Sequence, residues 1–228
     1  MQHRLILFDN DGTLNTQFSC WRYIQQPLGI FEPKGRKLLE NHLEGKMDYE
    51  EFSKRAVALW QGLKIRDLEE IINRIPLRKG ARETLGYFRE NSYKVCAVSS
   101  GFDIWKSVFA NKYGFIFDDF LANHLVINSN GLLTGEIEMR VTDDTAGKNK
   151  GDQLNGLARK YGFDVCETIM VGDGLGDINA FKVAGLAFAA WPTNEKVAEA
   201  ADHLLDGESL ECLLKFFDNG KYIGAGQD

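Results

Sequence analysis

The chain has 228 residues, 44% of them hydrophobic and 26% charged, a balance typical of a globular protein with a buried core. Its net charge of −6 argues against a broad surface for nucleic acid or an anionic membrane, which would need an excess of Lys and Arg, but it allows a local site for one phosphate. No segment approaches the roughly 20 apolar residues of a membrane span. The four cysteines form no C-x-x-C pair, so neither a zinc site nor a disulfide framework is indicated.

Short continuous apolar runs predict strands that are buried on both faces of a parallel sheet. We interpret the first run, Leu5–Phe8, as a strand and not as part of a signal peptide, and we expect a cytoplasmic protein that is a monomer or a homodimer. Helical patterns separate the later runs, which implies right-handed crossovers and an α/β, doubly wound, mainly parallel sheet with a Rossmann-like core. The later runs are Lys94–Val98, Thr168–Val171, Leu186–Ala190 and His203–Leu205, and two of the intervening helices should end at Gly114 and Gly162.

Residues 15–78 interrupt this alternation, because they carry helical apolar stripes and no convincing strand. We interpret them as a helical cap inserted into a core of residues 1–14 and 79–228, with hinges near 15–17 and 76–80. Asp48 and Asp67, each followed three residues later by Glu, look like helix N-caps.

A second interruption spans residues 121–142. There Asn130-Gly131 lies between apolar residues, a combination that predicts a β-hairpin. We expect the last residues, from Gly220 on, to fray.

Two carboxylates, Asp9 and Asp11, follow the first strand directly, at the sheet edge where open α/β folds bind ligands. Close carboxylates repel each other and need a cation or a shared proton. Mg²⁺ suits the pair because it prefers oxygen ligands. For this pair alone, a turn in which both side chains cap backbone amides remains an alternative.

Asp173 and Asp177 lie in a Gly-rich turn after another apolar strand, at what should be the same edge. Four acidic side chains gathered there would be costly without a metal. The alternative is a simple strand-to-helix turn in which Asp177 starts the next helix.

Two serines and a lysine are candidates for binding a phosphate group. Ser99 and Ser100 end a strand, where a hydroxyl and backbone amides at a helix N-terminus could hold phosphate oxygens, although for this motif alone a Ser cap on the next helix is the favoured interpretation. Lys150 stands before Gly151 at the start of a helix and could neutralise a phosphate. Solvated lysine is the alternative reading of Lys150 and of nearby Lys148.

Together these motifs resemble the haloacid dehalogenase-like (HAD) phosphatase superfamily over essentially the whole chain: D-x-D-G-T-L, a strand ending in Ser, Lys-Gly before a helix, and G-D-G-x-x-D. Within it, the chain resembles the phosphoserine phosphatase-like branch. Residues 98–103 are similar to that branch's V-S-G-G-F-D, the segment from Ala122 to Gly135 is similar to its stretch before the Lys, and the helical insertion matches its cap domain.

The resemblance implies a Mg²⁺-dependent hydrolase of a small phosphorylated metabolite. Asp9 would be the nucleophile, forming an aspartyl-phosphate, and also a metal ligand. Asp11 would be the general acid and base, with its carbonyl on the metal. Asp173 would be a further ligand. Asp177 would orient the metal site without binding the metal directly, or through a water molecule. The phosphoryl group would be bound by Ser99, Ser100 and Lys150.

Three positions depart from the family pattern. Phosphoserine phosphatases carry a Glu seven positions after the acid/base Asp, and Phe18 stands there in this chain. An ammonium group beside Phe18 would be poorly held, so we expect phosphoserine itself to be a poor substrate. Ser100 replaces a Gly and Gly176 replaces an Asn.

The cap offers further candidates for substrate specificity. Trp21 and Trp60 are either core residues or the wall of an apolar pocket. Arg22, Arg36 and Arg55 could bind a second anionic group or could be solvated surface residues.

Three other functions remain open at this point. A phosphotransferase could use the same aspartyl-phosphate with an alcohol as acceptor. A receiver-like signalling module has a similar acidic cluster, but it is shorter and places its phosphoacceptor after the third strand. A non-catalytic phosphate-binding protein is argued against by the intact Asp9, Asp11, Lys150 and Asp173.

Overall fold

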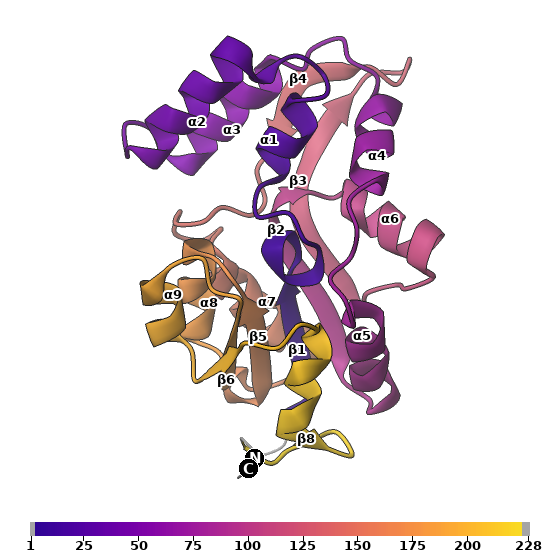
Figure 1. Cartoon of the computed structure of the whole chain (residues 1–228), viewed down its shortest axis with the longest axis vertical. Coiled ribbons are helices and arrows are strands. Elements are labelled where there is room, and N and C mark those ends of the chain that lie inside the picture. The colour runs from indigo at the N-terminus through magenta and orange to yellow at the C-terminus, as the bar shows by residue number, and fades with distance from the viewer. Residues whose placement is uncertain (1–2, 225–228) are drawn as a thin grey trace.

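The structure is a computed structural model that describes residues 3–224. Within that range a seven-stranded sheet has the order β4-β3-β2-β1-β5-β6-β7, with only β4 antiparallel to its neighbour (Figure 1). The strands are β1 (Leu5–Asp9), β2 (Lys94–Phe102), β3 (Asp119–Ile127), β4 (Leu133–Glu138), β5 (Thr168–Gly172), β6 (Leu186–Ala190) and β7 (His203–Leu205), and β8 (Phe217–Asp218) pairs separately with β9 (Lys221–Tyr222).

The helices alternate with these strands except in one long stretch between β1 and β2. Gly114 and Gly162 adopt left-handed backbone angles and end α6 and α7, as predicted. In the described residues, no helix is both long and apolar enough to cross a membrane. The helices are α1 (Cys20–Gln25), α2 (Arg36–Leu43), α3 (Tyr49–Ala58), α4 (Ile65–Asn73), α5 (Ala81–Glu90), α6 (Ile104–Tyr113), α7 (Lys150–Tyr161), α8 (Ile178–Phe181) and α9 (Glu195–Ala200).

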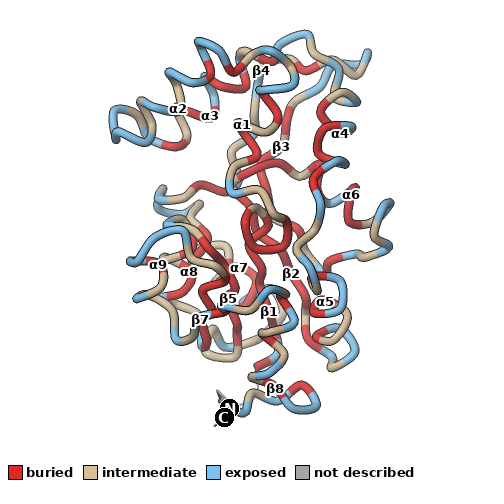
Figure 2. The backbone as a smooth tube through the Cα atoms, in the orientation of Figure 1, coloured by how far each residue is buried: buried red, intermediate tan, exposed pale blue. Residues whose placement is uncertain are grey.

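The central strands are buried on both faces. Along β1, Ile6 and Phe8 join the apolar cluster that contains α5 and α6, while Leu5 and Leu7 join the cluster that contains α7 and α8. Figure 2 shows the same result as a continuous buried path through the middle of the sheet. The predicted doubly wound α/β fold is therefore confirmed, and the carboxyl ends of β1, β2 and β5 meet at one edge.

Helices α1–α4 lie in the upper part of Figure 1, within the segment 15–78 predicted to be a cap, and we keep the name cap for this segment. The chain enters and leaves it along two neighbouring segments, where Asn15 pairs with Leu77. Asp48 caps α3 as predicted, accepting a 2.7 Å hydrogen bond from the Glu51 amide.

The second predicted N-cap, Asp67, is wrong. Helix α4 begins two residues earlier, at Ile65, so Asp67 lies inside its first turn. The reason is tertiary: Lys64 is held extended by a bridge to Leu132, and the Ile65 amide donates to the Gly131 carbonyl.

The predicted hairpin is confirmed, with Gly131 in its turn at φ 74°. It is not a break in the sheet, however, because the first half of β3 pairs in parallel with β2. The hairpin also touches the cap: Leu133 exchanges backbone hydrogen bonds with Gly62 and Leu63 at 2.9 and 2.8 Å. The cap therefore rests on an extension of the core sheet as well as on its two connections.

The end of the chain also differs from expectation. Lys221–Tyr222 forms β9, and the Tyr93 hydroxyl donates to the Gly220 carbonyl, so the predicted fraying is wrong for these residues. Residues 225–228 lie outside the described part of the chain.

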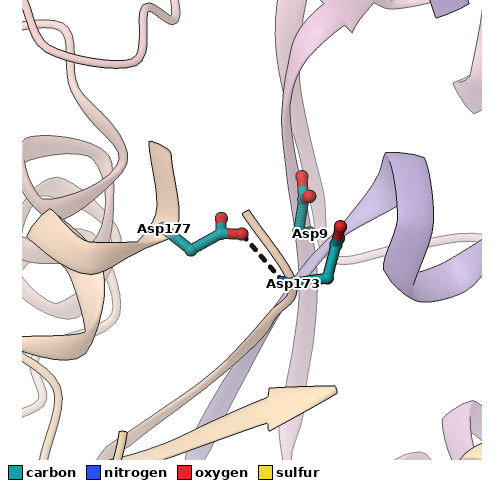
Figure 3. Close-up of side chains that lie close together, drawn as sticks. All are labelled: Asp9, Asp173 and Asp177. Carbon is teal, nitrogen blue, oxygen red and sulfur yellow. Dashed lines mark hydrogen bonds between the residues drawn. The ribbon is translucent and has the colours of Figure 1, made fainter. Parts of the chain in front are cut away.

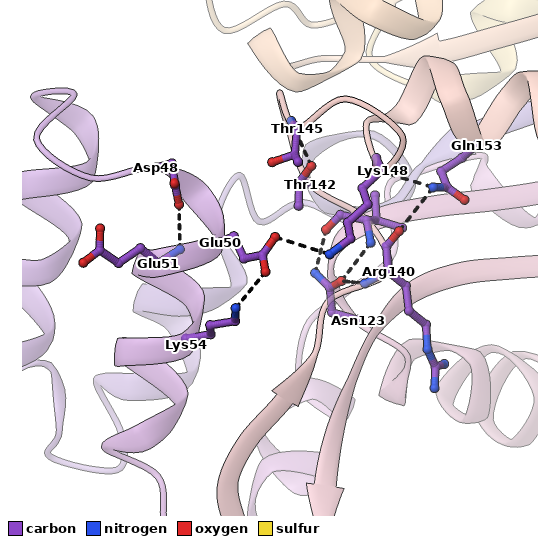
Figure 4. A network of polar contacts seen from close by, with 11 residues as sticks. Asp48, Glu50, Glu51, Lys54, Asn123, Arg140, Thr142, Thr145, Lys148 and Gln153 are labelled. Carbon is purple, nitrogen blue, oxygen red and sulfur yellow. Dashed lines mark hydrogen bonds and ion pairs between the residues drawn. The ribbon is translucent and has the colours of Figure 1, made fainter.

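A buried asparagine on β3 fixes the segment that precedes α7 (Figure 4). The Asn123 amide nitrogen donates to the carbonyls of Ser100 and Val141 at 2.7 and 2.9 Å, and its oxygen accepts from the amides of Arg140 and Val141 at 2.8 and 2.9 Å. The loop that follows is closed by a 3.0 Å hydrogen bond from the Thr142 amide to the Lys148 carbonyl. One side chain thus connects the end of β2 to the loop leading to Lys150.

We predict that Asn123→Ala destabilises the protein by about 3 kcal/mol, because it leaves several buried backbone groups without partners. Urea unfolding would measure the loss. Asn111→Ala, an exposed position on α6, is the matched control and should change the free energy of unfolding by less than about 0.5 kcal/mol. Equal effects of the two variants would contradict the role given to Asn123.

Candidate active site

Two loops approach each other closely at the carboxyl edge of the sheet. After Asp9 the chain turns through Gly12, whose φ of 88° favours glycine. A Cβ atom built at Gly12 would lie 2.3 Å from a carboxylate oxygen of Asp173, so a side chain there would collide with the loop after β5. The turn after β1 can reach that loop because residue 12 is a glycine.

Three buried carboxylates meet at this edge. The side chains of Asp9, Asp173 and Asp177 offer oxygens that all lie within 4.8 Å of one another (Figure 3). They come from β1 and from the loop after β5, which are adjacent because these strands pair in parallel. The predicted convergence of the two acidic motifs is thus present in the structure.

Hydrogen bonds hold the two later acids in different ways. The Thr13 hydroxyl donates to Asp173 at 2.9 Å. One oxygen of Asp177 accepts from the amides of Asp173 and Gly174 at 3.0 and 2.9 Å, which ties this carboxylate to its own loop. Asp177 is therefore positioned to support the loop, and Asp173 points toward Asp9.

Lys150 lies between the acids at the start of α7, and it is only 4% exposed. Its ammonium is 2.8 Å from Asp9 and 2.6 Å from Asp177. The neighbouring candidate, Lys148, is half-buried and instead pairs with Glu50 of the cap at 3.3 Å. Of the two lysines, the structure brings Lys150 to the acidic cluster.

The cluster has an excess of negative charge, and its pKa values reflect this. Burial raises the pKa of Asp9, as does Asp177, while Lys150 opposes the shift. Burial and Asp177 raise the pKa of Asp173 to about 7. Burial alone would lower the pKa of Lys150, but Asp177 and Asp9 raise it. Buried oxygen ligands with a single neighbouring ammonium fit a hard divalent cation such as Mg²⁺.

Asp11 and Ser99 lie beside this cluster. The Asp11 carboxylate accepts hydrogen bonds from the amide side chains of Asn15 and Asn10 at 2.8 and 2.9 Å, and burial raises its pKa. The Ser99 side chain is 1% exposed and accepts from the Gly101 amide at 2.9 Å. A Cβ at Gly101 would lie 3.0 Å from both side chains, so the two line the same small space.

A cavity of about 370 Å³ opens above the acids, between the core and the cap. Phe18 is 58% exposed and lies on its wall, and Trp21 contributes from α1, whereas Trp60 is fully buried elsewhere in the cap core. Ser100 also lines the cavity, although its carbonyl accepts from the Tyr49 hydroxyl at 2.6 Å.

The cap arginines do not line this cavity in the structure. Arg55 pairs with Glu51 at 2.5 Å, Arg36 pairs with Glu32, and the guanidinium of Arg22 lies 5.7 Å from the Phe31 ring centroid.

Sequence reasoning missed several residues of the site. Asp143 lies on its wall in the loop before Lys150, and no strand, glycine pattern or spacing marks it in the sequence. Thr13 is part of the D-x-D-G-T-L motif but received no role. The ring-bearing residues of α2 and α3, His42, Tyr49 and Phe52, have the spacing of ordinary core residues.

We predict that Mg²⁺ stabilises the folded protein through this cluster. At about 100 times its Kd a ligand adds about 2.7 kcal/mol, which for a chain of this size raises Tm by about 5–10 °C. Asp173→Asn should remove most of the shift, whereas Asp206→Asn, an exposed acid, should keep it. A full shift in Asp173→Asn, measured by thermal unfolding with and without EDTA, would argue against a metal at this place.

We also predict a pH dependence in the metal-free protein. Because the pKa of Asp173 is raised to about 7 in the folded state, from 3.8, the folded state holds a proton that the unfolded state has lost. The free energy of unfolding should therefore fall as pH rises through this window. Urea unfolding at about pH 5 and about pH 8 should show a smaller decline in Asp173→Asn than in the unsubstituted protein, and identical declines would refute the assignment.

The comparisons agree with this geometry. The sequence matches the haloacid dehalogenase-like hydrolase family over residues 6–182. It is 35% identical to phosphoserine phosphatase of Methanocaldococcus jannaschii over 93% of this chain and 97% of that protein, and 32% identical to that of Archaeoglobus fulgidus, of which it spans 58%. A solved structure described as a phospho-aspartyl intermediate analogue of phosphoserine phosphatase superposes with a TM-score of 0.79 at 33% identity, covering 96% of this chain and all of that one.

These relatives indicate a phosphatase enzyme and do not favour the phosphotransferase, receiver-like or non-catalytic interpretations. The chain belongs to the haloacid dehalogenase-like hydrolases, in their phosphoserine phosphatase-like branch.

Proposed function

We propose that this enzyme hydrolyses a small phosphate monoester by way of an aspartyl-phosphate on Asp9. The observation that carries the proposal is the position of the Asp9 carboxylate. It lies at the floor of a cavity, 2.8 Å from the Lys150 ammonium and beside two further buried acids.

In the first step an Asp9 oxygen attacks phosphorus, and the bond from phosphorus to the ester oxygen breaks. Asp11 gives its proton to the departing oxygen, so an alcohol leaves and an acyl phosphate remains. The raised pKa of Asp11 suits this acid role, because burial favours its protonated form.

In the second step a water molecule attacks the same phosphorus while Asp11 takes its proton. The bond between phosphorus and Asp9 breaks, which releases inorganic phosphate and restores both carboxyl groups. Ser99, Ser100 and Lys150 would hold the phosphoryl oxygens during both steps.

A divalent cation fits the same place. Asp9, Asp173 and the carbonyl of Asp11 would hold Mg²⁺, with Asp177 orienting their loop through its contacts with Asp173 and Gly174. When bound, the cation would neutralise charge on the phosphoryl oxygens and on the clustered acids.

Residues 15–78 would act as the cap that excludes water and selects the leaving group. Two contacts close the cavity at one side: the Tyr49 hydroxyl on the Ser100 carbonyl and the ion pair between Glu50 and Lys148. All of these groups come from one chain, so either a monomer or a homodimer would serve. The four free cysteines in the described part of the chain fit the cytoplasm as its compartment.

We predict that Asp9→Asn removes turnover of p-nitrophenyl phosphate, because the variant loses the carboxylate that we propose to carry the phosphoryl group. Asp11→Asn should behave differently. Nitrophenolate leaves without help from an acid, but the second step still needs a base, so the phosphoenzyme should accumulate and steady turnover should fall by about 10²–10⁴-fold.

Rapid-mixing kinetics would check both variants, since Asp11→Asn should release a burst of one nitrophenolate per site and Asp9→Asn should release none. A burst that persists in Asp9→Asn would exclude it as the nucleophile. Circular dichroism would establish that both variants are folded.

A further inference from the structure

Two of the positions at which the sequence departs from its family pattern lie beside the same side chain, Asp143. A Cβ atom at Gly176 would lie 2.7 Å from a carboxylate oxygen of Asp143, so a larger residue at position 176 would crowd this carboxylate. Ser100 lines the same cavity as Asp143 and is close enough to act on the pKa of its carboxyl group. The third departure, Phe18, lines the same cavity.

Asp143 adds a carboxyl group to the cavity wall beside the clustered acids, where Lys150 and Asp177 act on its pKa, which burial raises. Its charge is close enough to Tyr49 to contribute to the raised pKa of that phenol, and His42 is near enough to act on the Asp143 carboxyl. These contacts place the carboxylate between the loop that contains Gly176 and the cap helices α2 and α3.

Another part of the wall, supplied by the cap helices, is aromatic. The rings of Trp21 and Phe52 pack at 5.0 Å, and the His42 ring stacks on Phe52 at 5.1 Å. Tyr49 completes the wall, with its hydroxyl fixed between Trp21 and the Ser100 carbonyl. Aromatic rings beside a carboxyl group form an environment that favours an ammonium group over an anionic one.

Positive charge is scarce in the same cavity. Among its described lining residues, only Lys150 and the imidazole of His42 can carry it, and Lys150 is engaged by Asp9 and Asp177. Arg78 does not line the cavity: its guanidinium donates to the Gly12 carbonyl and lies 4.1 Å from the Trp191 ring centroid. Among the described lining residues, a second anionic group on the substrate would therefore have only the His42 imidazole as a cationic partner.

We propose that the substrates are phosphate monoesters of amino alcohols without a carboxylate, with their cationic nitrogen against Asp143 and the aromatic wall. This inference rests on the proposed function, since the phosphoryl group must lie over Asp9. The bond between phosphorus and the alcohol oxygen breaks, water supplies the new oxygen and protons, and the products are a free amino alcohol and inorganic phosphate.

The position of Asp143 gives a different reason to expect that phosphoserine is a poor substrate. Phe18 suggested that the ammonium group would lack a partner, but the Asp143 carboxylate can pair with it. The group that disfavours phosphoserine is instead its carboxylate, which would lie in a cavity already rich in acids and lose its hydration without compensation.

The experiment compares kcat/KM for O-phosphoethanolamine, phosphocholine, O-phosphoserine and the neutral p-nitrophenyl phosphate, all with Mg²⁺. Phosphoethanolamine and phosphoserine differ by one carboxylate, and we expect at least about a tenfold preference for the former. Phosphoethanolamine and phosphocholine distinguish a hydrogen-bonded primary ammonium from a quaternary one held by the rings.

Asp143→Asn should lower the ratio of kcat/KM for the preferred amino-alcohol phosphate over that for p-nitrophenyl phosphate by about 10–100-fold. Asp144→Asn, the exposed neighbouring acid, is the matched control and should keep the ratio. Gly176→Asn should lower the ratio too, by crowding Asp143. Because two variants test the same carboxylate, the proposal stays testable if one of them fails to fold. Thermal unfolding would show whether each variant is folded.

The two proposals fail in different ways. If p-nitrophenyl phosphate is hydrolysed but phosphoserine is preferred, or if Asp143→Asn leaves the ratio unchanged, the substrate class is wrong and the phosphatase mechanism stands. If none of the four esters is hydrolysed, both are overturned.

Discussion

The ammonium of Lys150, held between the buried carboxylates of Asp9 and Asp177, is the interaction on which the site depends. Buried acids at one edge of a sheet repel one another, and a single lysine from α7 provides the positive charge that the chain itself can offer. The lysine can do so only if β1, β5 and the start of α7 lie close together. Strand β1 pairs directly with β5, and Asn149 caps the start of α7. The remaining negative charge makes the place suitable for a divalent cation and for a phosphoryl group bound to it.

The loop before α7 connects this chemistry to the rest of the molecule. Asn123 fixes its first residues from β3, and Lys148 joins its end to Glu50 in the cap. The same β3 continues into the hairpin on which the cap rests. The two ends of the cavity, at the clustered acids and at the cap, are therefore positioned by one continuous piece of sheet. The cap and the core therefore rest on the same strand, although they are separate stretches of the sequence.

Much of this arrangement could be predicted from the sequence because it depends on local patterns. Buried parallel strands are short apolar runs, helices α6 and α7 end at glycines, and the acids follow directly on strands. What could not be predicted depends on distant contacts. Helix α4 begins early because Lys64 pairs with Leu132, and β3 joins the sheet through half its length only. Asp143 carries no local signature, since its role comes from the space left by Gly176.

That complementarity between Gly176 and Asp143 constrains how related enzymes can diverge. An asparagine at position 176 and an aspartate at position 143 would crowd each other, so the Asp143 carboxylate would have to turn away from its present place when both are present. A change at one of these positions is therefore expected to alter the effect of a change at the other.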